Sequence, residues 1–598
     1  MKELRDRYEE RRQAFSLESD RLRSKYNTYA IVRLAVFIIG FIVAVLLWPK
    51  GWLFLGFVVV FLLGFTRFVK WHLRVQKDKL HHDQLTLVNE EELRYWEYDY
   101  QTQDNGAAFV DADHPYAVDL DIFGDYSFFQ YANRAATSIG KVMLATWFGR
   151  VASVSEIGER QAAITELSEQ LDWRQHMRAH GLSAEDDIKH VQSLQRWLDG
   201  ENLIHDNTKL KALLWISPLL AIAGVVLYIT YLPWTLALLF FLPAGLTLRS
   251  TIKRVDEIHS ETAKAGDILA HYARLVQHIE SGSFSSPLLE RLQASFVRDQ
   301  TTASVVLKKL SYIISQLNVR YNVFVFILNF IGLWDLNWVL RLEKWKARYR
   351  EQVPGWFDAL AEFEALSSLA TLKYNHPSWG FPQIDEQRNT LEAVALGHPL
   401  IKRDVLVSND LSMPTQGHIK LITGSNMAGK STFLRSVGIN IVMAMCGSVV
   451  CAKELNLPPL HVYTSMRTTD ALHESTSSFY AELKRLKMII EAVDARHDVF
   501  FILDEILKGT NSHDRHTGSR ALIDQMIQNK GAGLIATHDL ELGDMEAQSD
   551  GAIENLRMEV QVESGKLIFD YKIEKGVSES FNATQLMKDM GIKINVRS

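Results

Sequence analysis

Residues 423–432, TGSNMAGKST, have the composition and spacing of a loop that holds phosphate groups. Gly424 and Gly429 permit backbone turns that point amide N–H groups at phosphate oxygens. Lys430 would reach the outer phosphates of a nucleoside triphosphate, and the Ser431 hydroxyl would be a ligand of Mg²⁺. The predicted phosphate-binding residues are Gly424, Ser425, Asn426, Met427, Ala428, Gly429, Lys430, Ser431 and Thr432.

Two carboxylates and a histidine follow later in the chain. The apolar run DVFFILDE ends in Asp504 and Glu505, and the run LIATHD contains His538. Beside a phosphate loop, the first carboxylate suits Mg²⁺ binding and the second suits orientation of the attacking water. Alone, these would be an acidic turn and a structural histidine; in this order, the histidine suits a sensor of the γ-phosphate. The candidate catalytic residues are therefore Glu505, His538 and Lys430, and the candidate metal ligands are Ser431 and Asp504.

These side chains require elements that hold them together. From about Leu396 onward, the β-branched runs HIKLIT, DVFFILDE and GAGLIATHD alternate with helical stretches. Such alternation is typical of an α/β domain with a largely parallel sheet. We predict this domain over residues 393–598, with the phosphate loop between a strand and a helix. Residues 119–392 show mainly helical periodicity and form a second predicted region.

Four apolar blocks come as two pairs, each joined by a short turn. They span residues 34–48, 52–65, 213–229 and 232–248. A membrane-spanning helix needs about 20 apolar residues, so these blocks are at the short end of the range. The run FLGFVVVFLLGF has no polar face, which a surface helix of a soluble domain should have. We predict transmembrane hairpins at about 30–69 and 212–248; the alternative is four buried core helices.

The charges around these hairpins predict their orientation. Basic residues flank both hairpins, whereas the two turns carry only Lys50. The positive-inside rule then places both termini, the helical region and the α/β domain in the cytoplasm. The predicted location is the cell's inner or plasma membrane, with several spans. The first thirty residues have the pattern of a charged helical arm rather than a cleavable leader.

Other features limit the remaining possibilities. The 598 residues carry a formal net charge of −6, unlike a strongly basic nucleic-acid binder, and the two cysteines give no disulfide framework. The basic, aromatic segment 67–79 could bind nucleic acid or anionic lipid, and its place after an apolar block favours lipid. His81 and His82 could hold a metal, but a solvated helix face is the favoured interpretation. The block 321–334 is expected to be a buried or interfacial helix.

The motifs TGSNMAGKSTFLR, FFILDEILKGTNS and IATHD closely resemble the ATPase domain of the MutS family of DNA mismatch-repair proteins. The resemblance extends to residues 396–401 and 407–411 upstream and to 576–592 downstream, which is similar to the family's helical dimerisation segment. ESTSSFYAEL resembles the signature segment that completes the partner subunit's nucleotide site, with Ser477 as the implied contact. A weaker resemblance to the MutS core and lever helices begins at Phe123, so that the likeness covers about four-fifths of the chain.

The sequence also departs from that family. Residues 1–118 contain no counterpart of the mismatch-reading domain or of its Phe-x-Glu wedge. A hairpin stands where relatives insert a DNA-gripping clamp. The signature has Ser475 in place of its usual glycine, and Leu406 stands where relatives place an aromatic ring against adenine. The resemblance therefore supports hydrolysis chemistry more strongly than base selectivity, and it does not support mismatch recognition.

The combined prediction is a multidomain α plus α/β protein. Residues 1–118 form a charged arm with one hairpin, 119–392 a MutS-like helical core and lever region interrupted by the second hairpin, and 393–598 an ABC-type P-loop ATPase domain. The favoured hypothesis is a membrane-anchored, Mg²⁺-dependent ATPase that works as a homodimer in the lipid bilayer and binds DNA weakly if at all. One alternative is a membrane-transport or membrane-remodelling ATPase without a DNA role. Another is a soluble DNA-repair protein whose apolar blocks are core.

Overall fold

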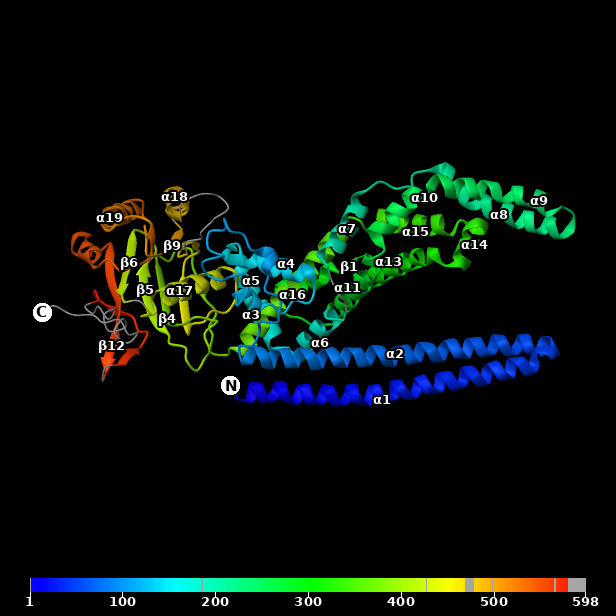
Figure 1. The fold of residues 1–598 in the computed structure, drawn as a ribbon, viewed down its shortest axis with the longest axis horizontal. Coiled ribbons are helices and arrows are strands. Elements are labelled where there is room, and N and C mark those ends of the chain that lie inside the picture. The colour runs from blue at the N-terminus through cyan, green and yellow to red at the C-terminus, as the bar shows by residue number, and fades with distance from the viewer. Residues whose placement is uncertain are drawn as a thin grey trace, which may run out of the picture.

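The structure is a computed structural model, which describes residues 2–183, 187–298, 300–425, 427–467, 478–496, 498–563 and 566–578. The molecule is elongated, with an α/β part at one end, helices in the middle and long helices that project at the other end (Figure 1). The large helical region and the C-terminal α/β domain confirm the predicted combination of fold classes.

A six-stranded sheet forms the centre of the α/β part, in the order β14-β11-β6-β10-β9-β8. All neighbouring pairs are parallel except β11 and β14, which are antiparallel. The strands are β6 (His418–Gly424), β8 (His461–Ser465), β9 (Val499–Asp504), β10 (Ala532–Thr537), β11 (Ile553–Met558) and β14 (Glu574–Lys575). A smaller sheet has the order β3-β7-β4-β5, and a separate hairpin pairs β12 with β13. These are β3 (Gln383–Ile384), β4 (Thr390–Leu396), β5 (Asn409–Pro414), β7 (Glu454–Leu457), β12 (Val560–Glu563) and β13 (Lys566–Phe569).

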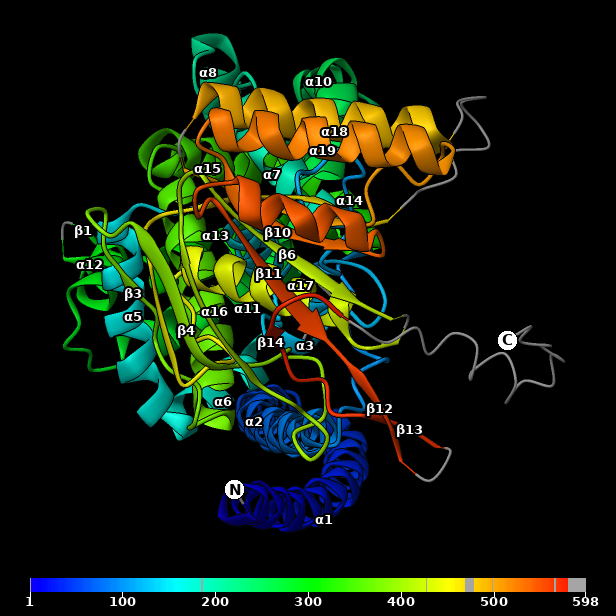
Figure 2. The same cartoon turned by 90° about the vertical axis from the view of Figure 1, so that its left-hand side faces the viewer.

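Helices cover both faces of the main sheet, as Figure 2 shows. Helix α17 (Lys430–Met445) packs on one face, and α18 (Ser478–Ala495) and α19 (Ser512–Gln528) pack on the other. The alternation of β9 matches these layers, because Phe500 and Ile502 join one hydrophobic core while Phe501 and Leu503 join the other. A strand buried on both faces is therefore apolar at successive positions, as residues 499–503 (VFFIL) are.

The middle of the molecule consists of helices that pack around one continuous hydrophobic core shared with the α17 side of the sheet. Its helices are α3 (Phe128–Ala132), α4 (Ser138–Phe148), α5 (Val154–Glu169), α6 (Leu171–Gly181), α7 (Ile188–Asp199), α11 (Ala265–Glu280), α12 (Pro287–Ser295), α13 (Ala303–Asn318), α15 (Trp334–Tyr349) and α16 (Val353–Asn375). The two-residue strands β1 (Val297–Arg298) and β2 (Thr301–Thr302) pair between α12 and α13. Helix α16 is almost entirely buried and packs against α4, α5 and α12.

The first hairpin consists of α1 (Lys2–Leu47) and α2 (Trp52–Trp96), which run side by side (Figure 1). Both helices continue far beyond the apolar blocks, so the charged arm and the membrane-type segment form one rod. A Cβ atom on Gly40 would lie 2.2 Å from the Phe61 ring, which shows how closely the two helices approach. Small residues commonly permit such contacts between apolar helices.

The second hairpin consists of α8 (Thr208–Thr230), the short α9 (Trp234–Ala237) and α10 (Leu242–Thr262), and it projects in the same general direction as the first (Figure 1). Gly224 repeats the close contact of the first hairpin, because a Cβ atom there would lie 2.7 Å from Cβ of Phe240. The fifth apolar block forms α14 (Val323–Gly332), which packs against α8 and α10. Its Phe326 and Ile327 are 61% and 52% exposed, so the expectation of a buried helix is wrong. An interfacial helix, the other possibility, stays a prediction.

Within the part of the chain that the structure describes, four helices are long and apolar enough to cross a membrane, by length and composition only, or up to five if α14 and α15 form one span bent by 79°. Large apolar side chains along these helices are exposed, including Leu46, Trp52 and Leu63. The alternative of four buried core helices is therefore wrong. Burying these side chains requires an apolar phase or another protein surface, since the fold itself leaves them uncovered.

Candidate functional site

The motifs found along the sequence meet at one edge of the main sheet. Strands β6, β10 and β9 are neighbours, and their register aligns Thr537 with Thr423 and Ala536 with Asp504. The phosphate loop follows β6, His538 follows β10, and Glu505 follows β9. In open α/β sheets, ligands bind at the carboxyl ends of the strands, where these three segments lie.

Two glycines shape the phosphate loop as the sequence predicts. Gly424 has φ of +154° and Gly429 has φ of +102°, and both values favour glycine. A Cβ atom on Gly424 would lie 2.4 Å from the Met558 carbonyl oxygen, so the loop can pass β11 only with glycine there. Helix α17 begins at Lys430, and its N-terminal N–H groups therefore face the loop.

Lys430 lies at the centre of the predicted site. Its Nζ donates hydrogen bonds to the carbonyl oxygens of Gly424 at 2.7 Å and Ser425 at 3.1 Å, and it lies 3.5 Å from His538 Nε2. Burial lowers the pKa of the Lys430 amine, and the nearby Asp504 and Glu505 oppose that shift. The amine is thus held inside the loop, next to both carboxylates.

Glu505 has an unusual backbone and strong ionic partners. Its φ is +52°, and Leu507 follows with φ of +58°. Its Oε1 lies 2.6 Å from His538 Nε2, and its Oε2 lies 3.2 Å from Lys508 Nζ. The hydrogen bond from His538, with help from the charge of Lys508, lowers the pKa of the carboxyl to about 2. Positive φ values in non-glycine residues cluster at functional sites, where the surrounding structure holds them.

The loop that carries Glu505 is held from α18. The Glu482 carboxylate accepts backbone hydrogen bonds from Leu507 and, at 3.1 Å, from Lys508. Sequence reasoning missed Glu482 because an acidic residue on a helix has no visible partner in the sequence. Glu482 belongs to the signature-like segment ESTSSFYAEL, whose second half forms the start of α18, so this contact joins that segment to the Glu505 loop.

A cavity of about 550 Å³ lies over the phosphate loop. The Ser425 hydroxyl oxygen is buried without a hydrogen-bond partner among the described residues, which suits a phosphate or water ligand. The residue types present therefore fit a nucleotide triphosphate with Mg²⁺. The predicted residues that line the cavity are Ser425, Met427, Gly429, Lys430, Ser431, Thr432, Asp504, Glu505 and His538. Gly424 and Ala428 belong to the loop without lining the cavity, and Asn426 and Ser477 lie outside the described residues.

The far side of the same cavity contains residues that sequence reasoning did not identify. Tyr571, Val405 and Val407 line it, whereas Leu406 packs into the hydrophobic core. Leu406, which stands where relatives place an aromatic ring against adenine, therefore does not line this cavity, whereas its neighbours Val405 and Val407 do. Tyr571 supplies an aromatic ring whose Cδ1 lies 3.0 Å from the position of a Cβ on Gly429. Its only signal in the sequence is an aromatic residue after an apolar run.

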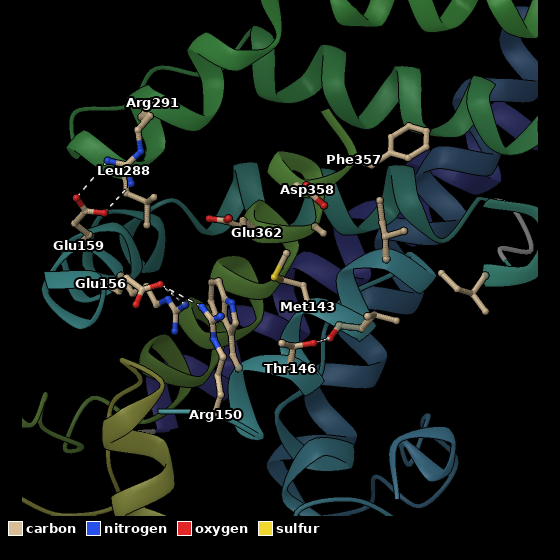
Figure 3. A pocket seen from close by; sticks show the side chains of 16 residues that line it. Met143, Thr146, Arg150, Glu156, Glu159, Leu288, Arg291, Phe357, Asp358 and Glu362 are labelled. Atoms are coloured by element: carbon tan, nitrogen blue, oxygen red, sulfur yellow. Dashed lines mark hydrogen bonds and ion pairs between the residues drawn. The ribbon is translucent and has the colours of Figure 1, made fainter. Parts of the chain in front are cut away.

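A second cavity of about 560 Å³ lies among α4, α5, α12 and α16 in the helical region. Figure 3 shows that its rim pairs Arg291 with Glu159 and Arg150 with Glu156, and the closest atoms of these pairs are 2.7 Å and 3.2 Å apart. Burial raises the pKa of Glu362 on its wall. It shares no residue with the phosphate loop, so the nucleotide chemistry belongs to the cavity over β6.

Arg403 and Asp121 are among the residues that connect the nucleotide end to the helical region. Arg403, in the loop that also carries Val405, donates a 2.9 Å hydrogen bond to the Asn375 carbonyl oxygen, and its guanidinium lies 4.3 Å from the Trp96 ring centre at the end of α2. On the other side, Asp121 forms ion pairs with Arg435 of α17 at 3.1 Å and with Arg467 at 2.8 Å.

Comparison with known proteins agrees with this geometry at the C-terminal end. Residues 420–594 match the family model of MutS domain V. The chain is 32% identical over 238 residues to the DNA mismatch repair protein MutS of Thermotoga maritima, which covers 39% of this chain and 29% of the relative. It is 31% identical over 226 residues to that of a Geobacillus species, covering 37% of this chain and 26% of the relative.

These matches define the C-terminal part as a MutS-family ATPase domain, which implies ATP hydrolysis. The chain spans less than a third of the length of these relatives. The family match therefore covers the C-terminal part of the molecule, and the helical region is described from the structure alone.

Proposed function

We propose that this protein is a membrane-anchored ATPase, in which ATP binding and hydrolysis at composite sites of a homodimer move the helical region and its hairpins. The observation that carries the proposal is the convergence of Lys430, Asp504, Glu505 and His538 in one cavity of a chain that also exposes two apolar hairpins. The family match supports ATP as the nucleotide.

The site residues have distinct roles in this proposal. Lys430 exchanges its loop carbonyl partners for the outer phosphates, and Ser431 and Asp504 hold Mg²⁺, which neutralises phosphate charge when bound. Glu505 orients the attacking water. In the present arrangement His538 Nε2 lies 2.6 Å from Glu505 Oε1, so His538 would have to move before that oxygen can contact the attacking water. A move of His538 from Glu505 toward the γ-phosphate would link nucleotide sensing to activation of that carboxylate.

The proposed dimer makes each nucleotide site depend on two chains. Ser477, which precedes α18, is the proposed contact to the partner's nucleotide. We expect Lys430→Ala and Ser477→Ala proteins each to be weakly active and their mixture to recover part of the ATPase activity. Recovery arises because some mixed dimers retain one intact site. Activity per molecule that is independent of dilution, without rescue on mixing, would instead indicate a self-sufficient monomer.

The contacts of Arg403 and Asp121 support transmission of motion from the nucleotide to the helices. Arg403 belongs to a segment that lines the nucleotide cavity and contacts the end of the first hairpin. Asp121 connects the start of the helical region to α17, which begins at Lys430. Closure around ATP would therefore act on the helices at two separate points. Such coupling requires that ATP favours one of two arrangements.

The direction of the hairpins supports one shared membrane. Both project away from the ATPase domain (Figure 1), and exposed basic residues follow their apolar parts. These residues include Arg67, Lys70 and Arg74 on α2 and Arg249, Lys253 and Arg254 on α10. Basic residues at such positions remain on the cytoplasmic side and attract anionic lipid headgroups. The ATPase domain then lies in the cytoplasm.

The test is ATP hydrolysis by the full chain reconstituted in lipid nanodiscs. We expect Mg²⁺-dependent hydrolysis that Lys430→Ala lacks and that anionic lipid increases relative to zwitterionic lipid. Matched arms add homoduplex DNA or a duplex with a G·T mismatch, and we expect little change in either. If the wild type hydrolyses ATP no faster than Lys430→Ala, the proposed ATPase activity is wrong. If DNA alone strongly stimulates hydrolysis, the protein acts on DNA instead of on the membrane.

A further inference from the structure

The cavity among α4, α5, α12 and α16, which we call the helical cavity, has a volume of about 560 Å³. Sites for small molecules commonly have volumes of about 300–1,000 Å³. One face of α4 forms an apolar wall of this cavity, because Ile139, Val142, Met143 and Trp147 recur at helical spacing and all line it. Phe357 of α16 adds an aromatic ring to the lining. The helical cavity therefore has the size and the apolar surface that suit a small organic molecule.

The three arginines that line the helical cavity already have partners. Two of them form the ion pairs on its rim that Figure 3 shows. The third, Arg160, donates a 3.0 Å hydrogen bond from Nη1 to the Cys446 carbonyl oxygen, and its guanidinium lies 3.8 Å from the Trp147 ring centre. The positive charge around the cavity is thus engaged in contacts within the protein, which leaves little of it to attract an anionic ligand.

Two carboxylates on α16 differ from these arginines. Asp358 and Glu362 are four residues apart, so they share one face of the helix, and Figure 3 shows both above Met143 of α4. Among the described residues, neither carboxylate has a hydrogen bond or a close ion pair. Burial raises the pKa of both, and for Glu362 the charges of Arg160 and Arg291 oppose that shift. Asp358 is exposed and Glu362 is half-buried, so negative charge without a close partner extends from the mouth of the cavity inward.

The combination of apolar wall and carboxylates determines the kind of ligand that fits. A positive group beside Asp358 and Glu362 would offset the cost of placing their charges in a partly buried position. A bare metal ion fits less well, because Mg²⁺ and Ca²⁺ usually take about six or more oxygen ligands and would leave the apolar wall uncovered. An anionic ligand would meet two like charges. An amine with an apolar body satisfies both parts of the lining.

We propose that the helical cavity is a binding site for a small organic cation, an amine with an apolar body. Its ammonium group would lie beside Asp358 and Glu362, and its body would pack on the apolar face of α4. The nucleotide cavity shares none of the residues that line this site, so the proposal does not depend on the proposed ATPase activity. Arg160 nevertheless connects the site to the carbonyl group of Cys446, at the C-terminal end of α17.

The test measures binding of 4-phenylbutylamine to the full chain by isothermal titration calorimetry. The protein is held in nanodiscs of zwitterionic lipid, and the heat of titration into empty nanodiscs is subtracted to remove partition of the amine into lipid. We expect saturable binding of one amine per chain. Two related compounds separate the parts of the ligand: 4-phenylbutanol has the same body without the charge, and methylamine has the charge without the body. Each should bind at least about tenfold more weakly.

Variants of the chain locate the bound amine. Glu362→Gln should weaken its binding about tenfold, because the amide keeps the shape of the side chain but not its charge. Glu351→Gln changes an exposed carboxylate just before α16 that does not line the cavity, and it should bind the amine as the wild type does. Val142→Trp places a larger ring on the apolar wall, at a side chain that is 39% exposed, and should prevent binding by filling the cavity.

The far-UV circular dichroism and Tm of each variant check that it is folded. If Glu362→Gln is not folded, Asp358→Asn replaces it and should also weaken binding of the amine. Equal binding of 4-phenylbutanol and 4-phenylbutylamine would overturn the proposal, because the charge would then have no role. Unchanged affinity in a folded carboxylate variant or in Val142→Trp would place the amine elsewhere and would overturn it too, as would the lack of saturable binding to the wild type.

Discussion

The two ends of the molecule depend on their residues in different ways. At the nucleotide end, single atoms matter, since a Cβ on Gly424 would meet the Met558 carbonyl oxygen at 2.4 Å and Glu505 is held between His538 and Lys508. At the apolar end, large exposed side chains cover the helices. Many different apolar residues could serve there. The free energy gained by burying a side chain in an apolar phase is proportional to its apolar area and does not depend on the direction of its contacts. The proposed chemistry thus depends on particular residues, whereas the proposed membrane anchoring depends on composition.

A buried ionic joint connects these ends. Glu92, on the part of α2 beyond the membrane-type segment, pairs with Arg134 at 2.5 Å and with Arg178 at 3.2 Å. It also accepts a 2.8 Å hydrogen bond from Asn375, which receives another from the Tyr8 hydroxyl of α1. Both helices of the hairpin are therefore fixed to α16. Like the nucleotide end, the joint depends on particular residues, although it fixes the hairpin whose far part is apolar.

The largest expected effect is confined to the nucleotide end. Glu505→Gln should reduce ATP hydrolysis by roughly 10²–10⁴-fold, because the carboxylate that orients water is lost while Asp504 remains. Binding of Mg-ATP and partition into the membrane fraction should both persist. Steady-state hydrolysis, nucleotide binding and fractionation are measured on the same preparations, with Glu541→Gln as a control at an exposed carboxylate. Near-normal turnover in Glu505→Gln would identify another residue as the one that orients water.

The next effect should appear in stability, at the joint. Glu92→Ala leaves Arg134 buried without its carboxylate, and loss of one partner of a buried pair costs about 3–5 kcal/mol of unfolding free energy. Glu257→Ala, which removes an exposed partner of Arg254, should cost at most about 1 kcal/mol. Chemical denaturation of both variants in the same detergent measures the difference. Equal losses would show that the joint contributes no more than a surface ion pair.

The same joint predicts a pH dependence. Burial alone would raise the pKa of Glu92, but Arg134 and its other partners lower it below the ordinary value. A carboxyl whose pKa is lower in the folded state contributes its full stabilisation above its ordinary pKa. The difference in stability between the wild type and Glu92→Ala should therefore shrink as the pH falls below about 4.5 and remain constant above it.

The sequence predicted the α/β fold of the nucleotide end because its motifs are short and contiguous. Residues 424–432, Asp504 and His538 follow strands that the apolar runs reveal, and parallel pairing brings the ends of those strands together. The sequence could not predict Tyr571 or Glu482, whose positions depend on how later segments return to the site. The contacts of His81 with His176 and His180 could not be predicted either, since α2 and α6 are far apart in the chain and helical periodicity alone does not show which faces meet.

A smaller effect should cross between the ends. Arg403→Ala removes the contact of the nucleotide-side loop with Trp96 and Asn375. If ATP acts on the hairpin through this loop, nucleotide affinity should change by about 5-fold or more, and ATP should no longer protect the end of α2 from hydrogen exchange. Lys402→Ala removes a charge from the same loop and serves as the control. Unchanged protection in Arg403→Ala would show that ATP does not act on the hairpin through this loop.

The smallest expected effect concerns DNA. Duplex affinity depends mainly on neutralising phosphates, and a chain of net charge −6 without a recognised mismatch-reading segment offers little basis for it. We expect duplex binding to be weak and to be lost by about 0.2 M salt. A G·T mismatch should alter affinity by less than tenfold and by less than the roughly 1–3 kcal/mol that one directly contacted base pair contributes. Titration of labelled homoduplex and G·T duplex at two salt concentrations measures both quantities. A preference of tenfold or more for the mismatch at physiological salt would mean that the helical end recognises DNA. Particular residues would then matter at both ends of the molecule, and the comparison between the two ends would be wrong.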